Sequence, residues 1–139
     1  MECKVKWSGD GMSFLAETGS KHCVVMDGAP EAGGRNIAPR PMELLLAGTG
    51  GCSAFDVVLI LKKGRQAVTG CEVSLQAERA ESDPRVFTRI HLSFRVSGKQ
   101  LKPEAVARAI ELSKEKYCSA SIMLGKTAEI THDFEIIDD

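Results

Sequence analysis

The feature that most constrains this chain is a long apolar segment covering residues 41–63. It opens with Pro41, which suits a first helical residue because its missing N–H has no helical partner there. Two lysines and then a glycine close it, as is typical of a helix end. Between these ends only Glu43 and Asp56 carry charge. The segment therefore predicts a helix of about 22 residues, ~33 Å long.

Such a helix is apolar nearly all round, and it must be surrounded by other apolar groups. A chain of 139 residues folds as one domain, or as two closely associated lobes, and has little material to cover it. We therefore expect a partner subunit that covers the long helix.

The helix contains the sequence GTGGCS, residues 48–53, in which three glycines precede a cysteine. A dinucleotide-binding loop would need a third glycine where Ser53 stands, and no parallel βαβ unit is predicted to follow. A phosphate loop would need a Gly-Lys-Ser/Thr sequence, which is absent. In a helix the three glycines cost roughly 3 kcal/mol relative to alanine, which predicts close packing or open space around Cys52. The sequence does not distinguish close packing at the glycines from open space around Cys52.

The order of the predicted elements defines the fold class. Before the long helix, short apolar runs separated by glycine turns predict three strands, around Val5 and Trp7, at 12–15 and at 23–26. Residues 28–40 are rich in Gly, Pro and Ala and predict a loop.

After the helix, two alternating runs at 71–78 and 88–96 predict an antiparallel hairpin with one solvated face. Pro103 opens a second helix, a short third helix is predicted at 118–124, and a last strand covers 128–137. The order β-β-β-α-β-β-α-α-β predicts a single α+β domain over residues 1–139.

Charge and targeting signals exclude several classes of partner. The 18 basic and 19 acidic residues nearly cancel, so no basic surface for nucleic acid or for a membrane is expected. The start of the chain lacks the apolar core of a signal peptide, and the longest apolar runs are expected to be far shorter than a membrane span. Five cysteines in such a chain predict free thiols, and the cytoplasm is the expected compartment.

Cysteine is more often an inert buried residue than a nucleophile, which is the default for Cys3, Cys23 and Cys71. Cys52 stands out because it lies mid-helix among glycines, and Cys118 because it lies between two predicted helices, where a thiolate is stabilised. The cysteines and histidines lack the closely spaced pairs of a structural zinc site. We expect no metal site and no cofactor.

The segments APRPMELLLAGTGGCSAFDVVLIL and EKYCSASIML resemble those of the OsmC/Ohr family, and most closely its YhfA-like branch. The resemblance covers nearly the whole chain, including the order of elements. It implies an OsmC-like fold in which two chains intertwine, with the long cysteine-bearing helices at the centre and antiparallel sheets wrapped around them.

The resemblance also implies a chemistry, the defence against oxidative stress by a peroxiredoxin-like thiol reaction. Active family members reduce an organic hydroperoxide with one cysteine, resolve the sulfenic acid with a second, and are regenerated by a dithiol reductant. By position Cys52 would attack and Cys118 would resolve. Arg40 and Glu43 are the candidates for the family's arginine and glutamate, and Met42 and Phe55 for walls of an apolar binding pocket.

The sequence departs from the family pattern around the attacking cysteine. The family's glutamate directly follows a proline, where this chain has Met42, and Glu43 is the next residue. Glu43 precedes Cys52 by nine residues, which is two and a half helical turns, and so points to the opposite side of the helix. Asp56, one turn after Cys52, would raise the pKa of the thiol.

A binding module is the alternative to the enzyme. The same dimer could retain a cysteine-lined apolar pocket for a small lipophilic or thiol-reactive ligand, with Met42, Phe55 and Met123 as its walls. The pKa of Cys52 discriminates between the two: a value well below ~8.5 favours catalysis, and a value above it favours binding.

Overall fold

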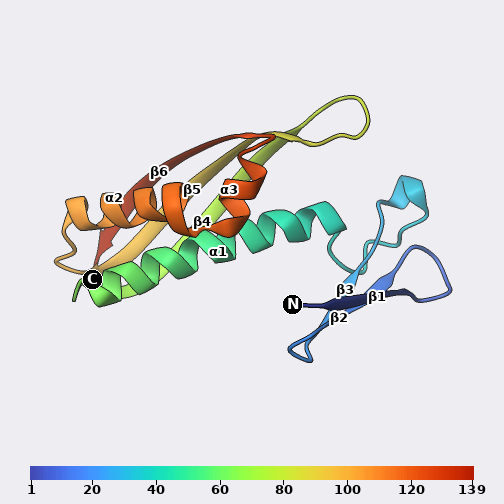
Figure 1. The fold of residues 1–139 in the computed structure, drawn as a ribbon, viewed down its shortest axis with the longest axis horizontal. Helices are drawn as coiled ribbons and strands as arrows, with labels where there is room; N and C mark the ends of the chain where they lie inside the picture. The colour runs from blue at the N-terminus through green and yellow to red at the C-terminus, as the bar shows by residue number, and fades with distance from the viewer. The chain divides into compact units, whose positions relative to one another are not determined.

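A computed structural model describes residues 1–139 (Figure 1). Its contacts group the chain into two units, Met1–Ala47 and Gly48–Asp139, which are described in turn. The elements follow the predicted order, with one additional 3₁₀ turn and one π-helical turn: β1 (Cys3–Trp7), β2 (Phe14–Thr18), β3 (Cys23–Met26), η1 (Pro30–Ala32), α1 (Pro41–Lys63), β4 (Ala67–Arg79), β5 (Phe87–Lys99), α2 (Pro103–Leu112), η2 (Ser113–Tyr117), α3 (Ser119–Leu124) and β6 (Glu129–Asp138).

The first unit is built on an antiparallel sheet of order β1-β2-β3. The prediction for the second strand was wrong at both ends, since β2 begins at Phe14 and continues to Thr18. The reason is a tight turn between β1 and β2. In this turn Gly9 and Gly11 adopt positive φ, and the Trp7 indole N–H donates to the Gly11 carbonyl at 3.0 Å.

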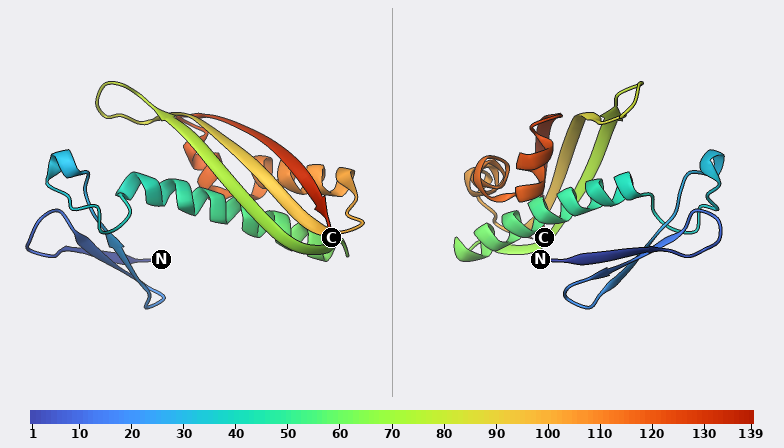
Figure 2. Two further views of the ribbon diagram at one scale, coloured as in Figure 1. Left: turned by 180° about the vertical axis from the view of Figure 1, so that it is seen from behind. Right: turned by 45° about the vertical axis from the view of Figure 1, so that its right-hand side comes forward.

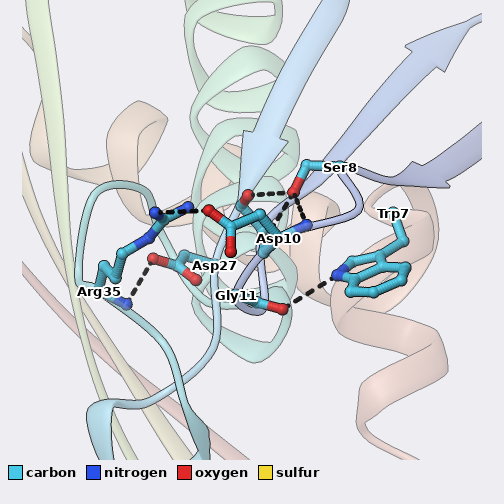
Figure 3. A network of polar contacts seen from close by, with 7 residues as sticks. Trp7, Ser8, Asp10, Gly11, Asp27 and Arg35 are labelled. Atoms are coloured by element: carbon cyan, nitrogen blue, oxygen red, sulfur yellow. Dashed lines mark hydrogen bonds and ion pairs between the residues drawn. The ribbon is translucent and has the colours of Figure 1, made fainter.

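A buried carboxylate orders the predicted loop in the first unit (Figure 3). Asp27 is 1% exposed and accepts the backbone N–H groups of Gly28, Arg35 and Ile37 at 2.8, 2.9 and 3.3 Å. These bonds, of which that from Arg35 is the strongest, lower the pKa of Asp27. The Arg35 guanidinium in turn lies 3.2 Å from Asp10. Arg35 therefore has a structural role in this unit.

The second unit carries the sheet β4-β5-β6. β4 and β5 form the predicted antiparallel hairpin, longer at both ends than expected, and β6 pairs with β5 in parallel. A parallel neighbour needs a long crossover, and here α2, η2 and α3 supply it. Figures 1 and 2 show these helices and the second-unit part of α1 on one face of the sheet.

Alternation along β5 builds the core of this unit. Ile90, Leu92, Phe94 and Val96 are all buried, at 3% exposure or less, as expected for one face of a strand against helices. Val57 and Leu61 of α1 are buried as well.

The three glycines of α1 have different surroundings. A Cβ atom on Gly50 would lie 2.6 Å from Leu75 Cδ1, so close packing against β4 explains this glycine. A Cβ atom on Gly48 or Gly51 would meet nothing within 4 Å. Together with Phe55 and Leu59, which are 68% and 39% exposed, Gly48 and Gly51 form an exposed stripe on α1. Nothing else in the second unit covers this stripe.

By length and composition α1 would suffice to cross a membrane, with a mean hydropathy of 1.9 over its most apolar window, of which 28% is buried in the chain. The expectation that apolar runs are too short for a span therefore holds only for uninterrupted runs. Core helices of soluble proteins meet the same criterion, so a single such helix is weak support for a membrane location.

Candidate functional site

The fold brings together two thiols and a carboxylate within the second unit. Cys52 and Asp56 lie one turn apart on α1, and Cys118 directly precedes α3. One donor atom from each of the three side chains lies within 4.8 Å of those of the other two. Residues 44–53 are continuous helix, so the nucleotide-loop interpretation of GTGGCS is wrong.

The π-helical turn η2 positions Cys118. After α2 the chain widens into this turn, which closes with a bond from the Cys118 N–H to the Ser113 carbonyl at 2.8 Å. π-helical turns are rare and often occur at functional sites. Cys118 then leaves the helical conformation, with φ −75° and ψ 98°, and caps α3. Its side chain thus points back toward α1.

Hydrogen bonds favour the thiolate form of Cys118. Its sulfur accepts the Ser53 hydroxyl and the Ser121 backbone N–H, both at 3.4 Å. Burial of this residue, which is 0% exposed, opposes ionisation. Bonds from Ser121, Ser53 and Cys52 together outweigh burial and lower the pKa of the Cys118 thiol.

Cys52 has the opposite tendency. Burial raises the pKa of its thiol, and the neighbouring Cys118 and Asp56 raise it further. A bond from the backbone N–H of Ala120 offsets this only in part. The predicted effect of Asp56 on Cys52 is confirmed in direction, although Asp56 is the smallest of these causes. Of the two thiols, the buried Cys118 is therefore the one that ionises more readily.

Asp56 is held in place by the crossover. The Ser113 hydroxyl donates to Asp56 Oδ2 at 3.0 Å, and the carbonyl of the same serine accepts the Cys118 N–H. One residue of the π-helical turn thus fixes both the carboxylate on α1 and the start of α3. The three serines 53, 113 and 121 were not identified from the sequence. Only the position of Ser53 beside Cys52 and that of Ser121 in the first turn after Cys118 could have suggested them.

The other predicted site residues belong to α1 and to the segment that precedes it. At the start of α1, Glu43 accepts the backbone N–H of Arg40 at 3.3 Å and lies 3.7 Å from the Arg40 guanidinium. Both Glu43 and Cys52 belong to α1, nine residues apart in the sequence. Met42 is half-buried in the first turn of α1, whereas Phe55 belongs to the exposed stripe.

We predict that Ser53→Ala raises the pKa of the Cys118 thiol, because it removes a hydrogen bond that favours the thiolate. The pH at which Cys118 alkylation is half-maximal, followed by peptide mass spectrometry, measures this shift for one cysteine among five. Ser113→Ala is the matched control, since that hydroxyl bonds Asp56. An unchanged midpoint in Ser53→Ala would show that the bond has no electrostatic effect.

The chain has an α+β fold with two neighbouring thiols, one on the long helix α1 and the other in the crossover. These features define a class of two-cysteine α+β proteins. The family described as OsmC-like protein matches residues 33–133. Protein YhfA of Escherichia coli K12 is 53% identical over 137 residues, 99% of this chain and 98% of that protein. The chain belongs to the OsmC-like protein family.

Solved structures agree in fold. One structural-genomics structure is 50% identical, with a TM-score of 0.91 and complete coverage of both chains. An organic hydroperoxide resistance protein OsmC from Legionella pneumophila is 12% identical, with a TM-score of 0.70 over 96% of this chain and 95% of that chain. The predicted family and α+β fold are thereby confirmed.

Proposed function

We propose that this protein reduces organic hydroperoxides through Cys52 and Cys118, in defence against oxidative stress. The observation that carries the proposal is the pair of thiols within 4.8 Å, one of which is stabilised as a thiolate. Membership of the OsmC-like family supports a role of the peroxide-resistance type, and two structural neighbours bear the name organic hydroperoxide resistance protein.

Exposure and acidity divide the roles of the two thiols. Cys118 is fully buried, whereas Cys52 is half-buried and so can meet a substrate. Cys52, with its raised pKa, needs a base to ionise, and the adjacent Cys118 sulfur, whose pKa is lowered, can act as this base in its ionised form. In this scheme Cys52 transfers its proton to Cys118 and attacks the outer oxygen of the hydroperoxide. The S–O bond forms as the O–O bond breaks, and the alkoxide takes the proton from Cys118 to leave as an alcohol.

The second step closes a disulfide. The Cys118 thiolate attacks the Cys52 sulfenic acid, the S–S bond forms, and hydroxide leaves and is protonated by solvent to water. The sulfurs need only approach from less than 4.8 Å to about 2.05 Å, a movement within reach of side-chain rotation. A dithiol reductant then returns both thiols.

The organic part of the substrate would contact apolar groups beside Cys52. Phe55 lies three residues after Cys52 on the same helix and is 68% exposed, so it can contact an apolar chain. Met42 remains a candidate wall of this pocket. Arg40 and Glu43 pair with each other, and for them a structural role at the start of α1 is the simpler proposal.

The functional form in this proposal is a homodimer in the cytoplasm. The exposed stripe on α1, formed by Gly48, Gly51, Phe55 and Leu59, is apolar, and the two glycines would let another helix approach closely. The five free cysteines accord with a reducing compartment.

The direct test is a peroxide assay on the reduced protein. With cumene hydroperoxide and a dithiol, we expect catalytic consumption that yields one alcohol and one oxidised dithiol for each peroxide. Hydrogen peroxide at the same concentration is the matched substrate without an organic group, and it should react more slowly. No consumption of either peroxide with any dithiol would refute the enzyme.

The raised pKa of Cys52 favours a second function, the binding of a small lipophilic or thiol-reactive ligand. Saturable binding of an apolar probe by a protein that consumes no peroxide would support it.

A further inference from the structure

We propose that Cys52, Cys118 and Asp56 form a binding site for a thiophilic divalent cation, with Zn²⁺ as the expected ion. The site uses the two thiols of the proposed peroxide centre. Only its inhibitory consequence rests on the proposed function, whereas binding of the ion does not.

The first argument is the geometry of the donor atoms. Tetrahedral Zn²⁺ with bonds of about 2.3 Å to sulfur and 2.0 Å to oxygen holds its ligand atoms roughly 3.5–3.8 Å apart. The two sulfurs and a carboxylate oxygen of Asp56 already lie within 4.8 Å of one another. Side-chain rotations of about 1 Å would complete three bonds, and a water molecule would take the fourth position.

The second argument is the chemistry of the ligands. Two thiolates and one carboxylate select a thiophilic ion over Mg²⁺ or Ca²⁺, which prefer oxygen ligands. Both thiols must be deprotonated to bind the ion, so binding would release protons and become stronger as the pH rises.

The third argument is that each ligand already has an outer partner. Ser113 donates to Asp56 Oδ2, Ser53 and Ser121 donate to the Cys118 sulfur, and the Ala120 N–H donates to Cys52. Partners of this kind orient ligands in metal sites. Because Ser113 uses Oδ2, Oδ1 of Asp56 can turn to the ion.

The sequence did not predict this site because its ligands have no metal-binding spacing. Cys52 and Asp56 are separated by one helical turn, but Cys118 comes from a different element and joins them only in the fold. Bound Zn²⁺ would also occupy both sulfurs and so prevent their oxidation, and a disulfide between them would conversely exclude the ion.

The experiment uses Co²⁺ as a spectroscopic probe with the reduced full-length protein in the absence of oxygen. We expect one Co²⁺ per chain, a thiolate-to-cobalt charge-transfer band, and displacement of the cobalt by Zn²⁺. Asp56→Asn, which keeps the shape of the side chain, should weaken binding about 10–100-fold. Cys118→Ser should weaken the charge-transfer band, and the double variant Cys52→Ser/Cys118→Ser, which removes both thiolates, should abolish the band of this site. The double variant Cys3→Ser/Cys23→Ser removes two exposed thiols outside the site and should bind as the wild type does.

A charge-transfer band that survives in Cys52→Ser/Cys118→Ser, or an affinity unchanged in Asp56→Asn, would overturn the site. A second arm measures peroxide consumption with and without Zn²⁺, and then after a chelator is added. Peroxide consumption by a protein that binds no Co²⁺ would refute the metal site and leave the proposed enzyme unaffected. Co²⁺ binding by a protein that consumes no peroxide refutes the proposed enzyme and leaves the metal site standing.

Discussion

Cys52→Ser is expected to reduce peroxide consumption to the uncatalysed background, a loss of at least ~10³-fold. The reason is that serine keeps the size of the side chain but lacks a nucleophile that reacts with the O–O bond. Cys118 cannot replace it, because it is fully buried behind α1 and α3. The measurement is steady-state consumption of cumene hydroperoxide with a dithiol, and Cys71→Ser, outside the thiol pair, is the matched control.

The partner variant separates the two steps of the reaction. Cys118→Ser should complete at most one turnover per chain, more slowly than the wild type because the base is lost. Mass spectrometry should then find one added oxygen on Cys52, which a sulfenate-specific reagent traps. Multiple turnovers in Cys118→Ser would contradict the resolving role, and full activity in Cys52→Ser would contradict the attacking role.

The second large effect is expected at the exposed stripe of α1. Phe55→Arg should raise the dissociation constant of the homodimer at least ~100-fold, equivalent to about 2.7 kcal/mol. In a two-fold symmetric interface each change occurs twice, so two guanidinium groups would be brought together and deprived of water. Analytical ultracentrifugation over a range of concentrations measures the dissociation constant.

Ala107→Arg is the matched control for this prediction. Ala107 lies on the exposed side of α2, and the variant introduces the same charge on another helix. It should leave the association unchanged. A dimer that persists in Phe55→Arg would place the subunit interface away from this stripe, and a wild-type protein that is monomeric would refute the homodimer.

The sequence predicted the elements whose patterns are local. Pro41, the closing lysines and the apolar composition between them predict α1, and strict alternation along 88–96 predicts β5 and its buried face. The β1–β2 turn lies at the predicted glycines, but β2 begins two residues later than predicted, because the turn is longer and is closed by a bond from the Trp7 side chain to the Gly11 carbonyl. The parallel pairing of β6 with β5 was not predicted, because no local pattern records which neighbour a strand selects.

The same distinction applies to the site. Cys52 and Cys118 were identified from their local settings, and Asp56 from its position one turn away. The direction of the pKa shift was predicted for each thiol, but the hydrogen bonds that lower the pKa of Cys118 were not, because Ser53 and Ser121 reach it from two separate helices. The roles of Arg40 and Glu43 likewise depend on their own pairing, which competes with any contact to a substrate.

The long separation of Cys52 and Cys118 along the chain has a mechanical consequence. A bond between their sulfurs would close a loop of 66 residues that begins in α1 and contains the β4–β5 hairpin and the crossover helix α2. In the chain-entropy account, such a closure stabilises the folded state by about 4 kcal/mol, because the unfolded chain loses conformations. Disulfide formation would therefore stabilise the folded second unit. Reduction of the disulfide would lose this stabilisation and would be less favourable by the same free energy. The fold itself would thus help to set the redox potential of the pair.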